Sequence, residues 1–192
     1  MIMKILSTIL LTLLIVFGAC TSPQVSPDPF VRVSNGRLTV NGKPYYYIGT
    51  NFWYGAILGS QGQGGNRERL LRELDYLKAL GINNLRVLVG ADGKDGIPTK
   101  AEPALQVEAG VYNDTIFDGL DFFLSELDKR DMYAVLFLNN SWEWSGGYSQ
   151  YLYWAGHGEV PMPNVAGWDA FWHNMLSRKK HTICSGIILL TL

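Results

Sequence analysis

Residues 31–47 contain short segments in which hydrophobic and polar residues alternate, at 31–34 and 37–40, which is the period of a β-strand. Two Asn-Gly pairs, at residues 35–36 and 41–42, divide this stretch into short segments. Asn and Gly both tolerate the positive φ angles that tight hairpin turns demand. The pattern therefore predicts an N-terminal β-hairpin, from which an apolar strand continues over residues 45–51.

Two later stretches carry apolar residues at every third or fourth position, which is the spacing of an amphipathic helix. The first predicted helix covers residues 67–80, and Gly81 stands where a helix commonly ends. The second predicted helix covers residues 116–127. A short apolar strand is predicted after each helix, over residues 85–89 and 133–138.

The predicted order is therefore strand, helix, strand, helix, strand, which is typical of an α/β fold with a parallel sheet that helices cover. Polar and aromatic residues follow the strands: Asn51 and Trp53 come after the first, and residues 139–144 come after the third. In a (β/α)₈ TIM barrel the active site lies at these C-terminal strand ends. We therefore expect a partial (β/α)₈ barrel of roughly the first three βα units, preceded by the N-terminal β-hairpin.

Composition and charge exclude several classes of function. The chain has 16 Lys and Arg residues against 17 Asp and Glu residues, a net charge of −1, so it lacks the basic surface that nucleic-acid binding requires. The Gly-rich residues 55–65 have neither the GxGxxG spacing nor the lysine of a nucleotide-binding loop. The two cysteines and three histidines lack metal-site spacing, so we expect no metal and no cofactor.

Residues 136–154 carry the strongest functional signal, because an apolar strand runs directly into a loop of aromatic rings and amides. A pyranose has C–H faces that stack on indole and phenol rings, and a hydroxyl rim that hydrogen-bonds to amides. The rings show neither a helical nor a strand period, as a core element would. The rings are Trp142, Trp144, Tyr148, Tyr151, Tyr153 and Trp154, and the amides are Asn139, Asn140 and Gln150. The segment therefore predicts a carbohydrate-binding surface.

Three motifs carry a resemblance to a known family. They are Gly-Thr-Asn-Phe-Trp-Tyr-Gly at residues 49–55, Leu-Arg-Val-Leu at 85–88 and Leu-Asn-Asn-Ser-Trp-Glu-Trp-Ser-Gly-Gly at 138–147. Together they resemble the N-terminal part of glycoside hydrolase family 5, specifically its endo-β-1,4-mannanases. The resemblance implies a (β/α)₈ barrel that hydrolyses mannans with retention, and so a β-mannan or related polysaccharide as partner.

The resemblance also implies roles for individual residues. In the family the general acid/base Glu follows strand 4 within an Asn-Glu pair, and the nucleophilic Glu follows strand 7. Arg86 matches the arginine of strand 2 that supports the nucleophile, and a guanidinium does hold a carboxylate ionised. The expected substrate-binding residues are Asn51, Trp53, Asn140, Trp142, Trp144 and Tyr148.

Both catalytic glutamates are expected to be absent from this chain. The sequence contains no Asn-Glu pair, and its 192 residues fall short of the roughly 250 of a (β/α)₈ barrel. Glu143 and Glu159 match no catalytic position, and Glu143 is expected to contact substrate. We therefore expect an N-terminal piece of an endo-β-1,4-mannanase that is inactive alone. The alternatives are a related β-glucanase or cellulase of the same barrel family, and a non-catalytic glycan-binding surface lipoprotein.

The end of the sequence departs from the family's pattern. Residues 177–192 pass from a basic run into a short apolar stretch. A frameshift or a premature stop would produce an aberrant tail of this kind. The alternative is a divergent helix followed by a fourth strand over residues 187–190.

The first twenty residues read as a processing signal, since a positive start and an apolar run too short to span a bilayer lead to small residues before Cys20. This pattern resembles a bacterial lipobox with Cys20 as the lipidated residue, although an ordinary cleaved signal peptide is the alternative. The expected organisation is a signal at 1–19, a tether at 20–29, part of a glycoside hydrolase barrel at 30–176 and the tail. The expected localisation is a secreted protein or a cell-surface or outer-membrane lipoprotein of a bacterium, in contact with the membrane only through its lipid.

Overall fold

The computed structural model describes residues 30–138, 141–159 and 162–177. The chain divides into two compact units, Met1–Tyr46 and Tyr47–Leu192. The predicted signal, Cys20, the tether, residues 178–192 of the tail and the alternative fourth strand all lie outside the described residues.

The first unit is a small antiparallel sheet in the order β1-β2-β3. Its strands are β1 (Arg32–Ser34), β2 (Arg37–Val40) and β3 (Lys43–Pro44). Asn35 and Asn41 have φ angles of 49° and 51°, so both Asn-Gly pairs form the turns that their residue types favour. The predicted N-terminal hairpin is therefore confirmed.

The second unit is built on a parallel sheet in the order β4-β5-β8. Its strands are β4 (Gly49–Asn51), β5 (Asn84–Leu88) and β8 (Tyr133–Phe137). Their register places Asn51, Arg86 and Val135 side by side. The α/β class with a parallel sheet is confirmed, and the described residues form no closed barrel.

The strand that the sequence predicted over residues 45–51 is shorter in the structure. Only Gly49–Asn51 is paired in the parallel sheet. Before it, the backbone N–H of Ile48 donates to the side-chain Oδ1 of Asn83 at 2.9 Å, so a side chain takes the place of a ladder partner. The apolar side chains of residues 45–48 did not show that the strand begins only at Gly49, because backbone hydrogen bonding decides where a strand begins.

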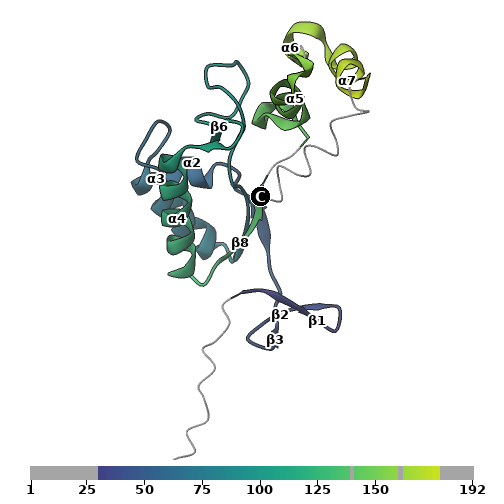
Figure 1. Ribbon diagram of the computed structural model, residues 1–192. Helices are drawn as coiled ribbons and strands as arrows, with labels where there is room; N and C mark the ends of the chain where they lie inside the picture. The colour runs from purple at the N-terminus through teal and green to yellow at the C-terminus, as the bar shows by residue number, and fades with distance from the viewer. Residues whose placement is uncertain (1–29, 139–140, 160–161, 178–192) are drawn as a thin grey trace, which may run out of the picture. The chain divides into compact units, whose positions relative to one another are not determined.

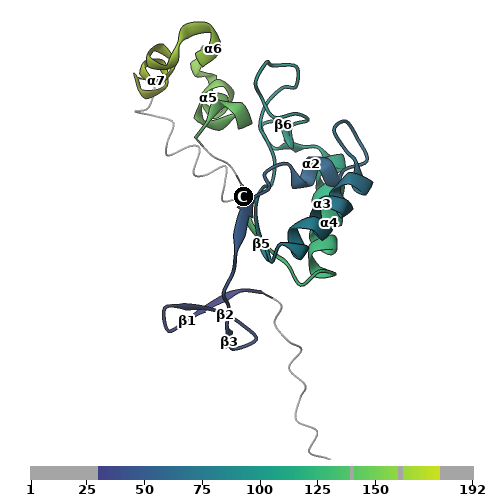
Figure 2. The same cartoon turned by 180° about the vertical axis from the view of Figure 1, so that it is seen from behind.

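Three helices, α2 (Gly55–Gly59), α3 (Arg67–Ala79) and α4 (Asp114–Asp128), lie on one side of the parallel sheet (Figures 1 and 2). Asn66 caps α3 by accepting the backbone N–H of Arg69 at 2.9 Å. Asn113 caps α4 in the same way. Asparagine favours this position because its side-chain oxygen satisfies a backbone donor that the helix leaves unpaired. Both predicted helices are therefore confirmed.

The hydrophobic core lies between these helices and the sheet. The fully buried side chains come from α3, β5 and α4: Leu70, Leu74, Leu85, Val87, Ile116, Phe123 and Leu127. Arg86 stands between Leu85 and Val87, and its side chain is directed to the opposite face of the strand. On that face the neighbouring Val135 is 51% exposed. The core thus sets which side of the sheet carries Arg86.

The short helix α2 was not predicted, because its sequence is rich in glycine. It packs closely against α4. A Cβ atom on Gly59 would collide with the backbone carbonyl of Gly119, so only glycine permits this approach of the two helices. The helix therefore depends on a contact between residues that are distant in sequence.

Two further regions follow the strands. After β5 the chain forms a hairpin of β6 (Gln106–Glu108) and β7 (Val111–Tyr112). After β8 it forms a 3₁₀ turn, η1 (Glu143–Ser145), and the helix α5 (Gly147–Leu152), whose last turn continues irregularly over Tyr153–His157. The last described helices are α6 (Pro163–Ala166) and α7 (Trp168–Ser177). Across the described residues, no helix has both the length and the apolar character needed to cross a membrane.

Candidate functional site

Arg86 connects the ends of the two strands that flank β5. It lies in the middle of β5, but its Nη1 donates to Oδ1 of Asn51, the last residue of β4, at 3.4 Å. Its guanidinium lies 3.7 Å from the ring centroid of Phe137, the last residue of β8. Within the described part of the chain Arg86 forms no salt bridge with a carboxylate. The structure thus brings together Asn51 and Arg86, both expected in the site, at the C-terminal end of the sheet.

Trp53 and Trp144 form a second pair, although they follow different strands. Their ring centroids are 5.3 Å apart and the ring planes meet at 68°, the edge-to-face arrangement that aromatic rings prefer. Both rings pack against the small buried side chains of Ala91, Ala101 and Ala104. Each ring is only partly buried. The pair therefore packs against the protein on one side and leaves some aromatic surface accessible to solvent.

Trp142 and Tyr148 are the more accessible of the expected substrate-binding aromatic residues, with 47% and 53% of their surface exposed. Trp142 contacts two rings of α7. Its centroid lies 5.6 Å from that of Trp168, at an interplanar angle of 83°, and 6.1 Å from that of Trp172. Trp168 is itself 47% exposed, so two half-exposed indoles stand side by side. Asn140, also expected here, lies outside the described residues.

Sequence reasoning missed Trp168, because it opens an ordinary amphipathic helix and no local pattern marks it. It became visible only through its contact with Trp142.

The loop after β5 (residues 89–105) is fixed to the aromatic loop (residues 141–154) by backbone hydrogen bonds. The N–H of Asp92 donates to the carbonyl of Ser145 at 3.0 Å, and the N–H of Ala101 donates to the carbonyl of Trp144 at 2.6 Å. Gly146 has a φ of 96°, and a Cβ there would lie 2.6 Å from the carbonyl oxygen of Asp92. Glycine at this position therefore allows the two loops to touch.

Asp92 is the buried centre of this loop contact. Its Oδ2 accepts the hydroxyl of Tyr151 at 3.2 Å, and its Oδ1 accepts Nε2 of Gln106 at 3.2 Å. Burial raises the pKa of Asp92 to about 6, while the bonds from Tyr151 and Gln106 and the charge of Lys100 act in the opposite direction. No local pattern marks this role in the sequence, since Asp92 lies in a Gly-rich, charged loop.

Glu143 is 8% exposed, and its Oε2 is buried without a hydrogen-bond partner among the described residues. A buried acceptor normally has a partner, so this oxygen is an exception among the described residues. In the described ranges no cluster of His, Cys, Asp and Glu side chains is arranged to hold a metal ion.

Comparison with known proteins gives a consistent picture. The family model described as GH family 5 beta-mannosidase-like matches residues 28–183. The putative mannan endo-1,4-beta-mannosidase 9 of rice is 30% identical over 183 residues, which are 92% of this chain and 41% of that protein. The crystal structure of the glycoside hydrolase family 5 mannosidase from Rhizomucor miehei has a TM-score of 0.74 and 34% identity, and the match covers 82% of this chain and 39% of that one.

These matches confirm the resemblance to family 5 enzymes of the mannanase type. The chain spans about two-fifths of the length of these two relatives. A mutant of the Rhizomucor miehei enzyme that was crystallised with mannosyl-fructose is also similar, with 36% identity and a TM-score of 0.72.

The prediction of a bacterial surface lipoprotein is wrong. Mannan endo-1,4-beta-mannosidases of two plants, rice and tomato, are among the curated relatives that match this chain. The prediction rested on a short apolar run before a cysteine. An apolar run of this length occurs in many kinds of targeting segment, so it identifies neither the organism nor a lipid anchor.

Proposed function

This chain belongs to glycoside hydrolase family 5, and from that membership we propose that it supplies the N-terminal part of a mannan-binding cleft of the endo-β-1,4-mannanase type. The observation that carries the proposal is the position of Arg86, which contacts the last residues of both neighbouring strands, Asn51 and Phe137. Ligands of parallel α/β sheets bind beyond this end of the strands.

In this proposal, residues 30–176 comprise the N-terminal hairpin and roughly three βα units of a (β/α)₈ barrel. The helices α2, α3 and α4 would form part of the outer layer of the barrel. The face that carries Arg86 and the half-exposed Val135 would line its interior. A barrel interior is filled by side chains from alternate strand positions, which suits the alternation of Leu85, Arg86 and Val87.

The exposed rings of Trp142 and Tyr148 would stack on the C–H faces of mannosyl units. The amide of Asn51 would hydrogen-bond to sugar hydroxyls. Arg86 would position and keep ionised the nucleophilic carboxylate of a complete site, since a nearby guanidinium favours the charged form of a carboxyl group. The accessible parts of Trp53 and Trp144 would bound the same cleft.

Retaining hydrolysis requires two carboxyl groups about 5 to 5.5 Å apart. The sequence has no Asn-Glu pair to supply the family's general acid/base. We therefore expect these 192 residues to bind β-mannan and not to hydrolyse it.

Isothermal titration calorimetry with mannohexaose and cellohexaose tests the proposal. We expect binding of mannohexaose, weaker binding of cellohexaose, and no release of reducing ends from soluble mannan. Tyr148→Ala should weaken the binding of mannohexaose. The matched control Tyr76→Ala, which removes an exposed tyrosine from α3, should not. Equal affinity for both oligosaccharides would refute mannan specificity, and failure to bind either would refute the proposed function.

A further inference from the structure

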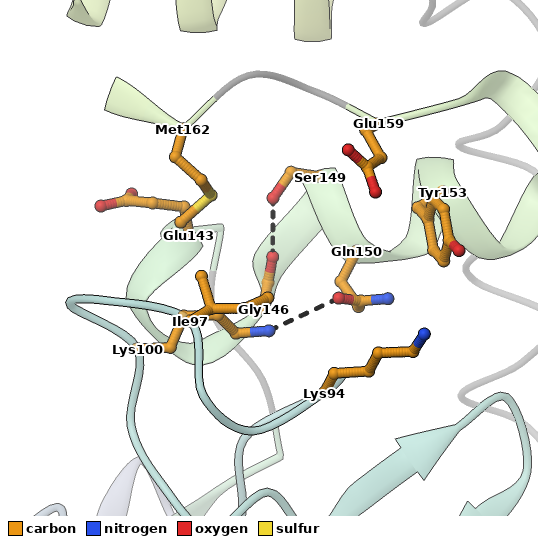
Figure 3. A pocket seen from close by; sticks show the side chains of 10 residues that line it. All are labelled: Lys94, Ile97, Lys100, Glu143, Gly146, Ser149, Gln150, Tyr153, Glu159 and Met162. Atoms are coloured by element: carbon orange, nitrogen blue, oxygen red, sulfur yellow. Dashed lines mark hydrogen bonds between the residues drawn. The ribbon is translucent and has the colours of Figure 1, made fainter. Parts of the chain in front are cut away.

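A cavity of about 350 Å³ lies between the loop after β5 and α5 (Figure 3). This volume is at the lower end of the roughly 300–1,000 Å³ that small-molecule sites occupy. The lining includes the polar side chains of Lys94, Lys100, Glu143, Gln150, Tyr153 and Glu159. None of the residues at the strand ends, Asn51, Arg86 and Trp53, belongs to this lining.

The formal charges of the lining balance, because it contains two lysines, Lys94 and Lys100, and two glutamates, Glu143 and Glu159. A phosphate or a uronate would meet two carboxylates there, and an amine would meet two ammonium groups. A neutral polyhydroxyl ligand avoids both conflicts. Each of its hydroxyls can donate to a carboxylate and accept from an ammonium group.

One wall of the cavity is held in place before any ligand binds. Nζ of Lys100 donates to the carbonyl oxygen of Asp92 at 2.8 Å and to Oε1 of Gln150 at 3.5 Å, as Figure 3 shows for the second of these. A Cβ on Gly93 would collide with the side chain of Gln150, so glycine allows the amide to lie against the loop. Fixed polar groups lose little conformational freedom when they bind a ligand.

The two ends of the lining differ in chemistry. Tyr153 lies at one end and Glu143 at the other (Figure 3). The ring of Tyr153 is 41% exposed, which leaves aromatic surface for a C–H face. At the other end, the side chain of Glu143 is more than nine-tenths buried, and its Oε2 has no partner among the described residues. An apolar face and a polar rim are the two features that a pyranose presents.

We propose that this cavity binds one neutral pyranose unit of the polysaccharide, with Tyr153 stacking on the ring and Lys94 and Lys100 donating to its hydroxyls. The inference rests on the proposed function for the identity of the sugar. It adds a point of attachment in the loop after β5, through Lys94 and Lys100, to which neither the sequence motifs nor the strand ends assign a role.

The test measures the affinity of the 192-residue chain for mannohexaose by calorimetry. We expect Tyr153→Ala and Lys94→Ala each to weaken binding about threefold or more, and the control Lys78→Ala on α3 to leave it unchanged. Unfolding in urea, followed by circular dichroism, should be similar for Lys94→Ala and wild type, because Lys94 is exposed. If both variants bind as wild type does while Tyr148→Ala binds more weakly, the cavity proposal fails and the proposed function stands.

A second readout is local to the cavity. Acylation of lysine amines, followed by mass spectrometry, should be slowed at Lys94 by mannohexaose and left unchanged at Lys78. Protection of Lys94 by inorganic phosphate, without protection by mannohexaose, would assign the cavity to an anion and overturn the proposal. A wild-type chain that binds no mannohexaose in either measurement would overturn both the cavity proposal and the proposed function.

Discussion

The guanidinium of Arg86 lies 3.7 Å from the ring centroid of Phe137, so a cation from the middle of β5 covers the ring at the end of β8. The same group reaches Asn51 on the other neighbouring strand. One side chain thus connects three parallel strands at the edge where the ligand is expected.

Replacing Arg86 with Ala should lower the free energy of unfolding by about 0.5–1 kcal/mol, the value typical of an exposed cation–π contact. Arg86→Lys should recover part of this loss, because an ammonium group keeps the charge and loses the planar stacking. Urea unfolding followed by circular dichroism measures both variants. Equal stability of wild type and Arg86→Ala would show that the contact with Phe137 contributes nothing to the sheet.

The raised pKa of Asp92 predicts a dependence of stability on pH. The folded protein holds the proton up to about pH 6, whereas an unfolded aspartate releases it near pH 4. Between these values the folded state binds more protons than the unfolded state. The stability that the protonated carboxyl contributes is therefore complete below about pH 4 and is lost as the pH rises towards 6, by at most about 3 kcal/mol.

The isosteric variant Asp92→Asn removes this titration and retains an acceptor for the hydroxyl of Tyr151. We expect the free energy of unfolding of wild type to fall relative to that of the variant as the pH rises from about 4 to about 6. Lys100, Tyr151 and Gln106 are unchanged in both proteins, so the difference isolates the carboxyl group. A difference that is constant across this range would contradict the prediction.

Trp168 should contribute to sugar binding together with Trp142. Their rings are 5.6 Å apart and both are half-exposed, so each supports the other and presents surface to solvent. We expect Trp168→Ala to weaken the affinity for mannohexaose about fivefold, which corresponds to about 1 kcal/mol.

The double variant Trp142→Ala/Trp168→Ala should lose less than the sum of the two single losses, because the residues act as one surface. Strictly additive losses in calorimetry would show that the two rings bind independently. Unchanged affinity of Trp168→Ala would remove Trp168 from the site.

The close packing of α2 on α4 predicts that Gly59→Ala is destabilising. The added methyl group would collide with the carbonyl of Gly119, and overpacking of this kind typically costs about 1–3 kcal/mol. Gly119→Ala should have a similar effect, since its methyl group would meet the carbonyl of Ala56. The melting temperature of both variants can be measured by thermal unfolding. A melting temperature equal to that of wild type would show that α2 and α4 can move apart to accommodate a methyl group without loss of stability.

The sequence predicted the elements that repeat a local pattern. The spacing of Leu70 and Leu74 located α3, and the Asn-Gly pairs located the hairpin, because each signal acts over a few residues. It did not predict α2, whose formation depends on Gly119, or the contact of Asp92 with Tyr151. Those features depend on side chains that meet only after the chain has folded.

The candidate site, too, could be predicted from the sequence only in part. Trp142 and Arg86 were identified from motifs, and Asn51 from its place after a strand. Their contacts with Trp168 and Phe137 are tertiary, so no local pattern records them. The cavity beside α5 was not predicted, because Tyr153 was expected to bind sugar but Lys94 and Lys100 lie in a separate loop that no motif marks.

The hydrogen bonds from Asp92 and Ala101 to the aromatic loop have a consequence for the order of folding. Each joins the segments that follow β5 and β8, so the pairing of these two strands shortens the chain that must be closed before either bond can form. We expect β5 and β8 to pair first and the aromatic loop to become ordered afterwards. In stopped-flow refolding, the tryptophan fluorescence should then change later than the far-ultraviolet circular dichroism. The ability to bind sugar would be the last property that the chain acquires as it folds.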